Sequence, residues 1–287
     1  MTTTANLRNA LLERGVTRSY SIAFTPRCGS TALTHLLAKA GLGNPTEYFQ
    51  YPYEPSEYWN WLSGRTVSER LVELVAGYQV NGIFASKQAH DHRAFLEGQL
   101  EMELGLPVVH LDEILPDHRW LFMHRADLVE QAISVHVARS SGVWHVLSGE
   151  DAPEKPAVAY DFLAILARLH QLMGAQFNWE LYFRTRGIHP LVIRYEDFVA
   201  DTPTTWAAIL AHLGKDGAPG SAPRLDADSG LERISGRWHD VYADLRARFV
   251  RDFLDTGKDR VWNEVGDDLA RWGRFLDQAG SHQEPSL

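Results

Sequence analysis

Cysteine is almost absent from this sequence of 287 residues, which contains only Cys28. A single cysteine excludes an internal disulfide and a metal site built from several thiolates. His90 and His92 have the spacing of a metal-binding pair, but no carboxylate or third histidine completes the set at a convincing spacing. We therefore expect a solvated turn at these two histidines and no bound metal.

Net positive charge and long apolar runs are also lacking. The formal net charge of -9 argues against a nucleic-acid partner or an anionic membrane surface, although it leaves room for a local basic pocket. No charged N-terminal region leads into a long apolar stretch, and no uninterrupted apolar segment has the length that a bilayer requires. We expect a cytoplasmic protein without stable membrane insertion.

Hydrophobic residues, in contrast, make up 45% of the chain, which is enough for a substantial core. We predict a single domain over residues 1–287, with an α/β fold in which helices flank a central parallel sheet. Short apolar runs predict strands at 19–24, 82–86, 119–123 and 191–193. In such a sheet, ligand groups lie at the carboxyl ends of the strands.

Helix signals fall between these strands. Thr66 with Glu69, and Asp127 with Glu130, have the spacing of helix N-caps. Further helices are predicted over 4–14, after 31, within 157–184 and from 202 onward. Two segments are additions to the domain: an extra N-terminal helix over about residues 1–17, and a flexible excursion over about 214–230, where Gly, Pro, Ser and Asp are dense.

The loop after the first predicted strand has the composition of a phosphate site. It reads Thr25-Pro-Arg-Cys-Gly-Ser-Thr31 and leads into a helix, whose N-terminal N–H groups and dipole favour an anion. Arg27 can add charge, and we expect Gly29→Val to abolish binding while leaving the fold largely intact. The first glycine and the lysine of a Walker A motif are missing, which disfavours a nucleoside triphosphatase. Taken alone, the loop also fits an ordinary turn with a serine cap.

A second pair of residues indicates another anion site on the same edge of the sheet. Arg125 follows the third predicted strand, and Ser134 lies nine residues later on the adjacent helix. Each residue alone is more often structural. Together with the first loop, they suit a nucleotide that is phosphorylated at both ends.

These residues resemble the sulfotransferases. The loop 25–31 resembles their 5′-phosphosulfate-binding loop, and Arg125 with Ser134 resembles their 3′-phosphate-binding pair. The stretch GNPTEYFQY over 43–51 is similar to a segment of the mycobacterial trehalose 2-sulfotransferase-like family, as are stretches around Lys87, at 142–144 and at 231–249. The resemblance implies a P-loop-like three-layer fold and 3′-phosphoadenosine 5′-phosphosulfate (PAPS) as the donor, with adenosine 3′,5′-bisphosphate as its product.

The resemblance also implies roles for individual residues. Glu47 matches the general base of the family, Lys87 contacts the bridging oxygen or the sulfuryl group, and Arg27 assists the transfer. The donor is implied to be bound by Arg27, Cys28, Gly29, Ser30, Thr31, Arg125, Ser134 and Arg233. The acceptor is expected to be a hydroxyl of a sugar or a small metabolite, no metal is required, and a homodimer is possible.

Several alternatives stay open at this point. Many sulfotransferases use a histidine base, and His124, beside Arg125, is the strongest candidate for that role. An atypical P-loop kinase and a nucleotide-binding module without chemistry would also use the loop. The aromatic residues between Tyr48 and Trp61 fit either packing of an irregular loop or stacking against an apolar or carbohydrate acceptor.

Overall fold

Four parallel strands form the centre of the molecule. A computed structural model describes residues 3–50, 61–147, 154–215, 222–231 and 234–255. The strands are β1 (Arg18–Phe24), β2 (Ile83–Gln88), β3 (His118–His124) and β4 (Leu191–Arg194), in the order β2-β1-β3-β4. The sequence placed all four within two residues at each end, and the predicted parallel sheet is confirmed.

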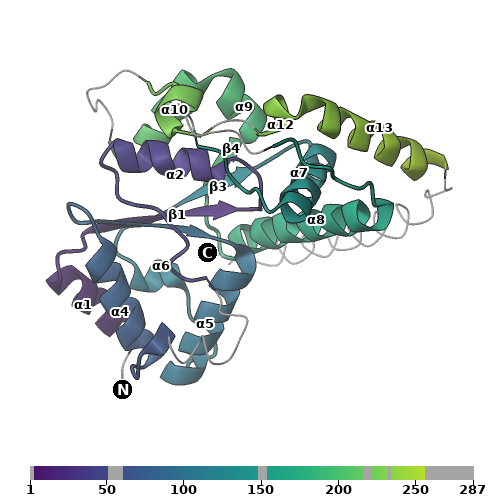
Figure 1. Cartoon of the computed structure of the whole chain (residues 1–287). Coiled ribbons are helices and arrows are strands. Elements are labelled where there is room, and N and C mark those ends of the chain that lie inside the picture. Colours follow the sequence, from purple (N-terminus) through teal and green to yellow (C-terminus); the bar gives the residue numbers. More distant parts are fainter. Residues whose placement is uncertain (1–2, 51–60, 148–153, 216–221, 232–233, 256–287) are drawn as a thin grey trace, which may run out of the picture.

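Helices cover both faces of this sheet. Figure 1 shows α2, α9 and α10 on one face and α1, α4 and α5 on the other, which confirms the predicted three-layer arrangement. The helices are α1 (Thr4–Glu13), α2 (Ser30–Lys39), α4 (Val67–Tyr78), α5 (His90–Leu104), α6 (Leu111–Ile114), α7 (Leu128–Ser141), α8 (Phe162–Thr185), α9 (Tyr195–Ala200), α10 (Thr202–His212), α11 (Leu225–Ser229), α12 (Ile234–Arg237) and α13 (His239–Asp255). None of the helices in the described part of the chain combines the length and apolarity that a bilayer crossing requires.

Two predicted helix starts have the expected cap geometry. The Thr66 hydroxyl accepts the Glu69 N–H, while the Glu69 carboxylate accepts the Thr66 N–H, so the capping box is complete. The Asp127 carboxylate likewise accepts the Glu130 N–H at 2.9 Å. Each cap satisfies backbone donors that have no partner inside the helix.

The expectation of a solvated turn at His90 and His92 was wrong, because both residues lie in the first turn of α5. The buried face of this helix carries the ion pair between Arg93 and Glu97, whose side chains are 6% and 4% exposed. Because charged residues occupy core positions of this helix, its sequence lacks the regular spacing of apolar residues by which a helix is recognised. The N-cap, Ala89, also makes no side-chain cap hydrogen bond.

The segment predicted as a flexible excursion contains a short helix. Within the described residues 222–230, α11 lies against α2 through a contact between the His35 ring and the Ser229 carbonyl at 2.8 Å. The Lys39 ammonium is 2.9 Å from the Asp228 carboxylate, which joins the same two helices. The chain over 216–221 lies outside the described residues.

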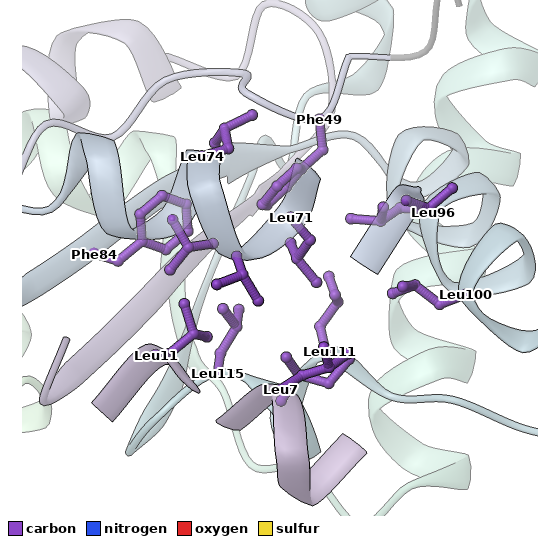
Figure 2. Packing of buried hydrophobic residues seen from close by; sticks show 14 of the residues in the cluster. Leu7, Leu11, Phe49, Leu71, Leu74, Phe84, Leu96, Leu100, Leu111 and Leu115 are labelled. Atoms are coloured by element: carbon purple, nitrogen blue, oxygen red, sulfur yellow. The ribbon is translucent and has the colours of Figure 1, made fainter. Parts of the chain in front are cut away.

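A large apolar cluster packs between β2 and the helices that cover it. Figure 2 shows side chains from α1, α4, α5, α6 and β2 converging, and Phe49, from the segment after α2, joins them. Phe49 is 4% exposed and its ring centroid lies 6.0 Å from that of Phe84. Since Phe49 is two residues after Glu47, this packing anchors the backbone of the segment that carries Glu47.

The cluster gives a prediction about stability. Leu71 is fully buried in it, so Leu71→Ala should lower the free energy of unfolding by about 2 to 5 kcal/mol. The matched control is Leu163→Ala on α8, where the side chain is 71% exposed and the change should stay within about 0.5 kcal/mol. Urea denaturation of both variants measures the difference, and equal losses would contradict the described packing.

Candidate active site

A cavity of about 950 Å³ lies at the carboxyl edge of the sheet. It is lined by the β1–α2 loop, the end of β2, the start of α5, one face each of α7 and α8, and α11. This volume is at the upper end of the usual range for a small-molecule pocket. The edge is the one at which an α/β sheet is expected to bind its ligands.

The β1–α2 loop is held by a buried amide. The Gln131 side chain, which is fully buried, donates to the Thr25 hydroxyl at 2.9 Å and to the Pro26 carbonyl at 2.6 Å. Ser30 and Thr31, in the first turn of α2, line the cavity, where N–H groups have no partner within the helix. The loop therefore has the form of an anion site at a helix N-terminus.

Cys28 has a different environment from its neighbours in the loop. Its thiol is fully buried in the core beside Leu33, and burial raises the pKa of the thiol. Its N–H donates to the Thr25 carbonyl at 3.3 Å. Any contact of Cys28 with a ligand is thus limited to its backbone.

Position 29 favours glycine for two reasons, its backbone conformation and its close contact with Tyr195. Its φ of +88° lies in the left-handed region, and a Cβ at this position would meet the Tyr195 ring at 2.6 Å. The expectation that Gly29→Val spares the fold was therefore wrong, because a side chain collides with protein atoms before it reaches a ligand.

Glu47 and Lys87 form an ion pair in the cavity. The Lys87 ammonium is 2.9 Å from a Glu47 carboxylate oxygen and 3.5 Å from the Thr31 hydroxyl, and it lies 4.6 Å from the centroid of the Phe24 ring. The Lys87 N–H also donates to the Thr46 carbonyl at 2.8 Å, which holds the segment after α2 beside β2. The structure thus brings together two of the residues to which the resemblance gave catalytic roles.

Arg27 lines the same cavity and contacts Ser134. Its Nε donates to the Ser134 hydroxyl at 3.0 Å, its guanidinium also donates to the Trp144 carbonyl, and Ser134 is 3.4 Å from the Tyr242 hydroxyl. Burial lowers the pKa of Arg27, an effect that Tyr242 opposes and Arg125 reinforces. The expected role of Arg27 at the first anion site stays a prediction, and its hydrogen bond to Ser134 also links it to the second.

Arg125 is a largely buried cation with an unused donor. Its side chain is 12% exposed, its guanidinium lies 4.6 Å from the centroid of the Tyr195 ring, and its Nε is buried without a hydrogen bond. The Glu196 carboxylate is 3.9 Å from that Nε, beyond hydrogen-bond distance, and accepts the N–H groups of Ala126 and Asp127 instead. Arg27 and Arg125 are thus two cations in the cavity that Ser134 also lines.

His90, His92 and His145 line the cavity, whereas His124, the histidine favoured from the sequence, does not. His124 stacks on Phe122, with ring centroids 5.3 Å apart, and it is not among the side chains that line the cavity. His145 does line it, and burial, with contributions from Arg27 and Lys87, lowers the pKa of His145 to about 4. No sequence signal marked His145, because it lies in a loop that only the fold brings back to the cavity.

Some predicted residues cannot be compared with the structure. Arg233 and the aromatic residues between 51 and 60 lie outside the described residues. Tyr48 and Phe49, which begin that aromatic stretch, pack against Phe84. Within the described ranges there is no group of three or more His, Cys, Asp or Glu residues arranged to hold a metal ion.

Comparisons with known proteins agree with this geometry. The model of the Stf0 sulphotransferase family matches residues 19–244. The chain belongs to this family. It is therefore a sulfotransferase, which excludes the kinase and the non-catalytic nucleotide-binding module as alternatives.

Two individual relatives have the same activity in their names. The chain is 26% identical over 257 residues to the trehalose 2-sulfotransferase of Mycobacterium tuberculosis, and 23% identical over 256 residues to that of Mycolicibacterium smegmatis. Each alignment covers 78% of this chain and 94% of the relative.

The Gly29 contact gives a second stability prediction for this sulfotransferase. Gly29→Ala should lower the free energy of unfolding by about 2 to 5 kcal/mol, because it combines a left-handed φ with a collision. Gly105→Ala is the matched control, since its φ of +65° is also left-handed but a Cβ would meet nothing within 4 Å. Its loss should be about 1 to 2 kcal/mol. Urea denaturation that gave the two variants equal stabilities would contradict the described position of Tyr195.

Proposed function

We propose that this sulfotransferase moves a sulfuryl group from PAPS to a hydroxyl of a sugar or small metabolite, with Glu47 as the general base and no metal. The observation that carries the proposal is the ion pair between Glu47 and Lys87, 2.9 Å apart in the cavity and next to Thr31 at the start of α2. A base, a cation and an anion site therefore share one cavity.

The residues present fit a donor that is anionic at both ends. The first turn of α2 supplies N–H groups and the hydroxyl of Thr31 for one end. For the other end, Arg125 offers a buried Nε without a partner, and Arg27 already hydrogen-bonds Ser134. A phosphate beside these groups would accept charge-assisted hydrogen bonds and would offset the repulsion between two nearby cations.

The chain's own residues then have distinct tasks. Glu47 takes the proton from the acceptor hydroxyl, and its ion pair with Lys87 holds the carboxylate in place in the cavity. Lys87 and the N-terminus of α2 stabilise the negative charge that develops on the donor side. The bound donor supplies the activated sulfuryl group, and the cavity walls hold both partners in line.

The acceptor is assigned more coarsely than the donor. The curated relatives are named for trehalose, and the cavity of this chain carries polar side chains, among them Gln50 and Asn178, that suit a hydroxylated acceptor. We therefore propose a sugar and take trehalose as the first compound to test. The homodimer and the cytoplasmic location stay predictions.

The donor assignment predicts selective binding. Adenosine 3′,5′-bisphosphate should bind much more tightly than adenosine 5′-monophosphate, because only the former reaches Arg125 and Ser134. Arg125→Ala should weaken bisphosphate binding by about 10- to 150-fold, the cost of losing a hydrogen bond to a charged group. Calorimetry in the presence of a chelator measures both effects.

The control for this variant is Arg18→Ala. Arg18 is an exposed arginine at the opposite edge of the sheet, paired with Asp117 at 3.9 Å, so its loss should leave bisphosphate affinity unchanged. Equal affinities of the unaltered enzyme for the two nucleotides would remove the basis of the donor assignment. So would a dependence of bisphosphate binding on magnesium.

The assignment of the base predicts a loss of turnover without a loss of donor binding. Glu47→Gln keeps the size of the side chain and should lower the turnover number by about 10²- to 10⁴-fold. Its bisphosphate affinity should stay within about threefold of the unaltered enzyme, because the carboxylate acts on the acceptor. Steady-state kinetics with trehalose and calorimetry measure the two quantities.

His145→Ala is the competing variant. If Glu47→Gln retained full turnover while a folded His145→Ala bound the bisphosphate but was inactive, the histidine would be the base. If Glu47→Gln instead lowered the melting temperature and raised only the Michaelis constant for the acceptor, Glu47 would serve to anchor its loop.

A further inference from the structure

His90 lines the cavity, but the mechanism above leaves it without a task. It is three residues after Lys87 and occupies the first position of α5, at the same edge of the sheet as the Glu47 and Lys87 pair. Its ring meets the Trp179 ring edge-on, with centroids 5.4 Å apart and planes at 90°. The imidazole is thus held in the wall of the cavity that Glu47 and Lys87 also line.

The hydrogen bond between His90 and Arg93 fixes the tautomer of the imidazole. One guanidinium nitrogen of Arg93 lies 3.0 Å from His90 Nε2. Because a guanidinium only donates, Nε2 must accept, and the ring proton must lie on Nδ1. Burial, reinforced by the charge of Arg93, lowers the pKa of His90 to about 4, so the ring is neutral at physiological pH.

Arg93 cannot turn to release the histidine without disrupting a buried network. It pairs with the Glu97 carboxylate and lies 3.8 Å from the centroid of the Tyr182 ring. Glu97 in turn accepts the Leu111 N–H at 3.1 Å and the Tyr182 hydroxyl at 3.2 Å. Each of these groups has defined partners, and removing one member of a buried ion pair is costly. The network therefore holds Nε2 of His90 in the role of acceptor.

The second ring nitrogen of this cavity-lining histidine is available for a ligand. Nδ1 of His90 has no hydrogen-bond partner among the described residues, although the structure does not bury it. We propose that His90 presents its Nδ1–H to the acceptor substrate and donates a hydrogen bond to one of its oxygen atoms. This inference rests on the proposed function and assigns to the same site a residue that determines acceptor specificity.

Two consequences follow for the reaction. An imidazole whose exposed nitrogen already carries a proton cannot accept another there, so His90 is excluded as the general base in this state. An acceptor without an oxygen atom within reach of the Nδ1–H would leave this donor without a partner. The missing hydrogen bond would make that compound a much poorer substrate.

The test uses two amide variants that imitate different halves of the ring. In His90→Asn the amide nitrogen lies near the position of Nδ1 and can donate to the acceptor, but the side chain is too short to reach Arg93. In His90→Gln the amide group lies near the position of Nε2 and can accept from Arg93, but it leaves the Nδ1 position empty. His90→Ala removes both groups.

The full-length enzyme is assayed with PAPS and trehalose. His90→Gln and His90→Ala should lower kcat/KM for trehalose by roughly 10- to 100-fold, mainly through KM, while His90→Asn should stay within about fivefold of the unaltered enzyme. Bisphosphate affinity, measured by calorimetry, should be unchanged in all three. A role that is only structural predicts the reverse order, with His90→Gln near normal and His90→Asn impaired, and would overturn the inference.

Three further outcomes complete the design. His90→Asn leaves Arg93 without its histidine partner and could melt well below the other variants. In that case the test uses His90→Gln alone, and a normal KM for trehalose in that variant overturns the inference. If the unaltered enzyme sulfates no hydroxylated acceptor at all, the proposed function fails together with the inference. If the unaltered enzyme is active and all three variants have its KM for trehalose, the inference about His90 is overturned and the proposed function is not.

Discussion

The site depends on the register of β1 with its two neighbours. Ile22 lies opposite Lys87 in β2 and opposite Leu121 in β3, so the three strands end almost together. The segments that follow them must then begin at one edge of the sheet. Gln131 fixes this arrangement, because its buried amide ties the loop after β1 to the helix that follows β3. Residues distant in the sequence thereby share one cavity.

This convergence gathers positive charge in a partly buried place. Arg27, Arg125 and Lys87 line the same cavity in a protein whose net charge is -9. Burial is the main cause of the lowered pKa of Arg27 and of His145, and neighbouring cations lower both further, while Tyr242 opposes the effect at Arg27. An anionic ligand relieves the repulsion and should stabilise the folded enzyme, by an amount that rises with the logarithm of its concentration relative to Kd. The gathered cations of the site thus favour an anionic ligand.

The sequence predicted the sheet well, because buried parallel strands are short apolar runs that a reader can recognise. It predicted the helices at Thr66 and Asp127 from local cap chemistry. It failed at α5, where the buried pair of Arg93 and Glu97 replaces apolar residues. The sequence could not predict the directions of side chains, since a contact such as that of Arg27 with Ser134 depends on tertiary packing.

The most direct test of the account is the stoichiometry of the reaction. The enzyme is incubated with PAPS and trehalose in the presence of a chelator, and both products are quantified by mass spectrometry. The account predicts one sulfated sugar for each adenosine 3′,5′-bisphosphate formed, with both absent when PAPS is omitted or replaced by ATP. Bisphosphate formed without any sulfated product from trehalose or another hydroxylated acceptor would contradict it.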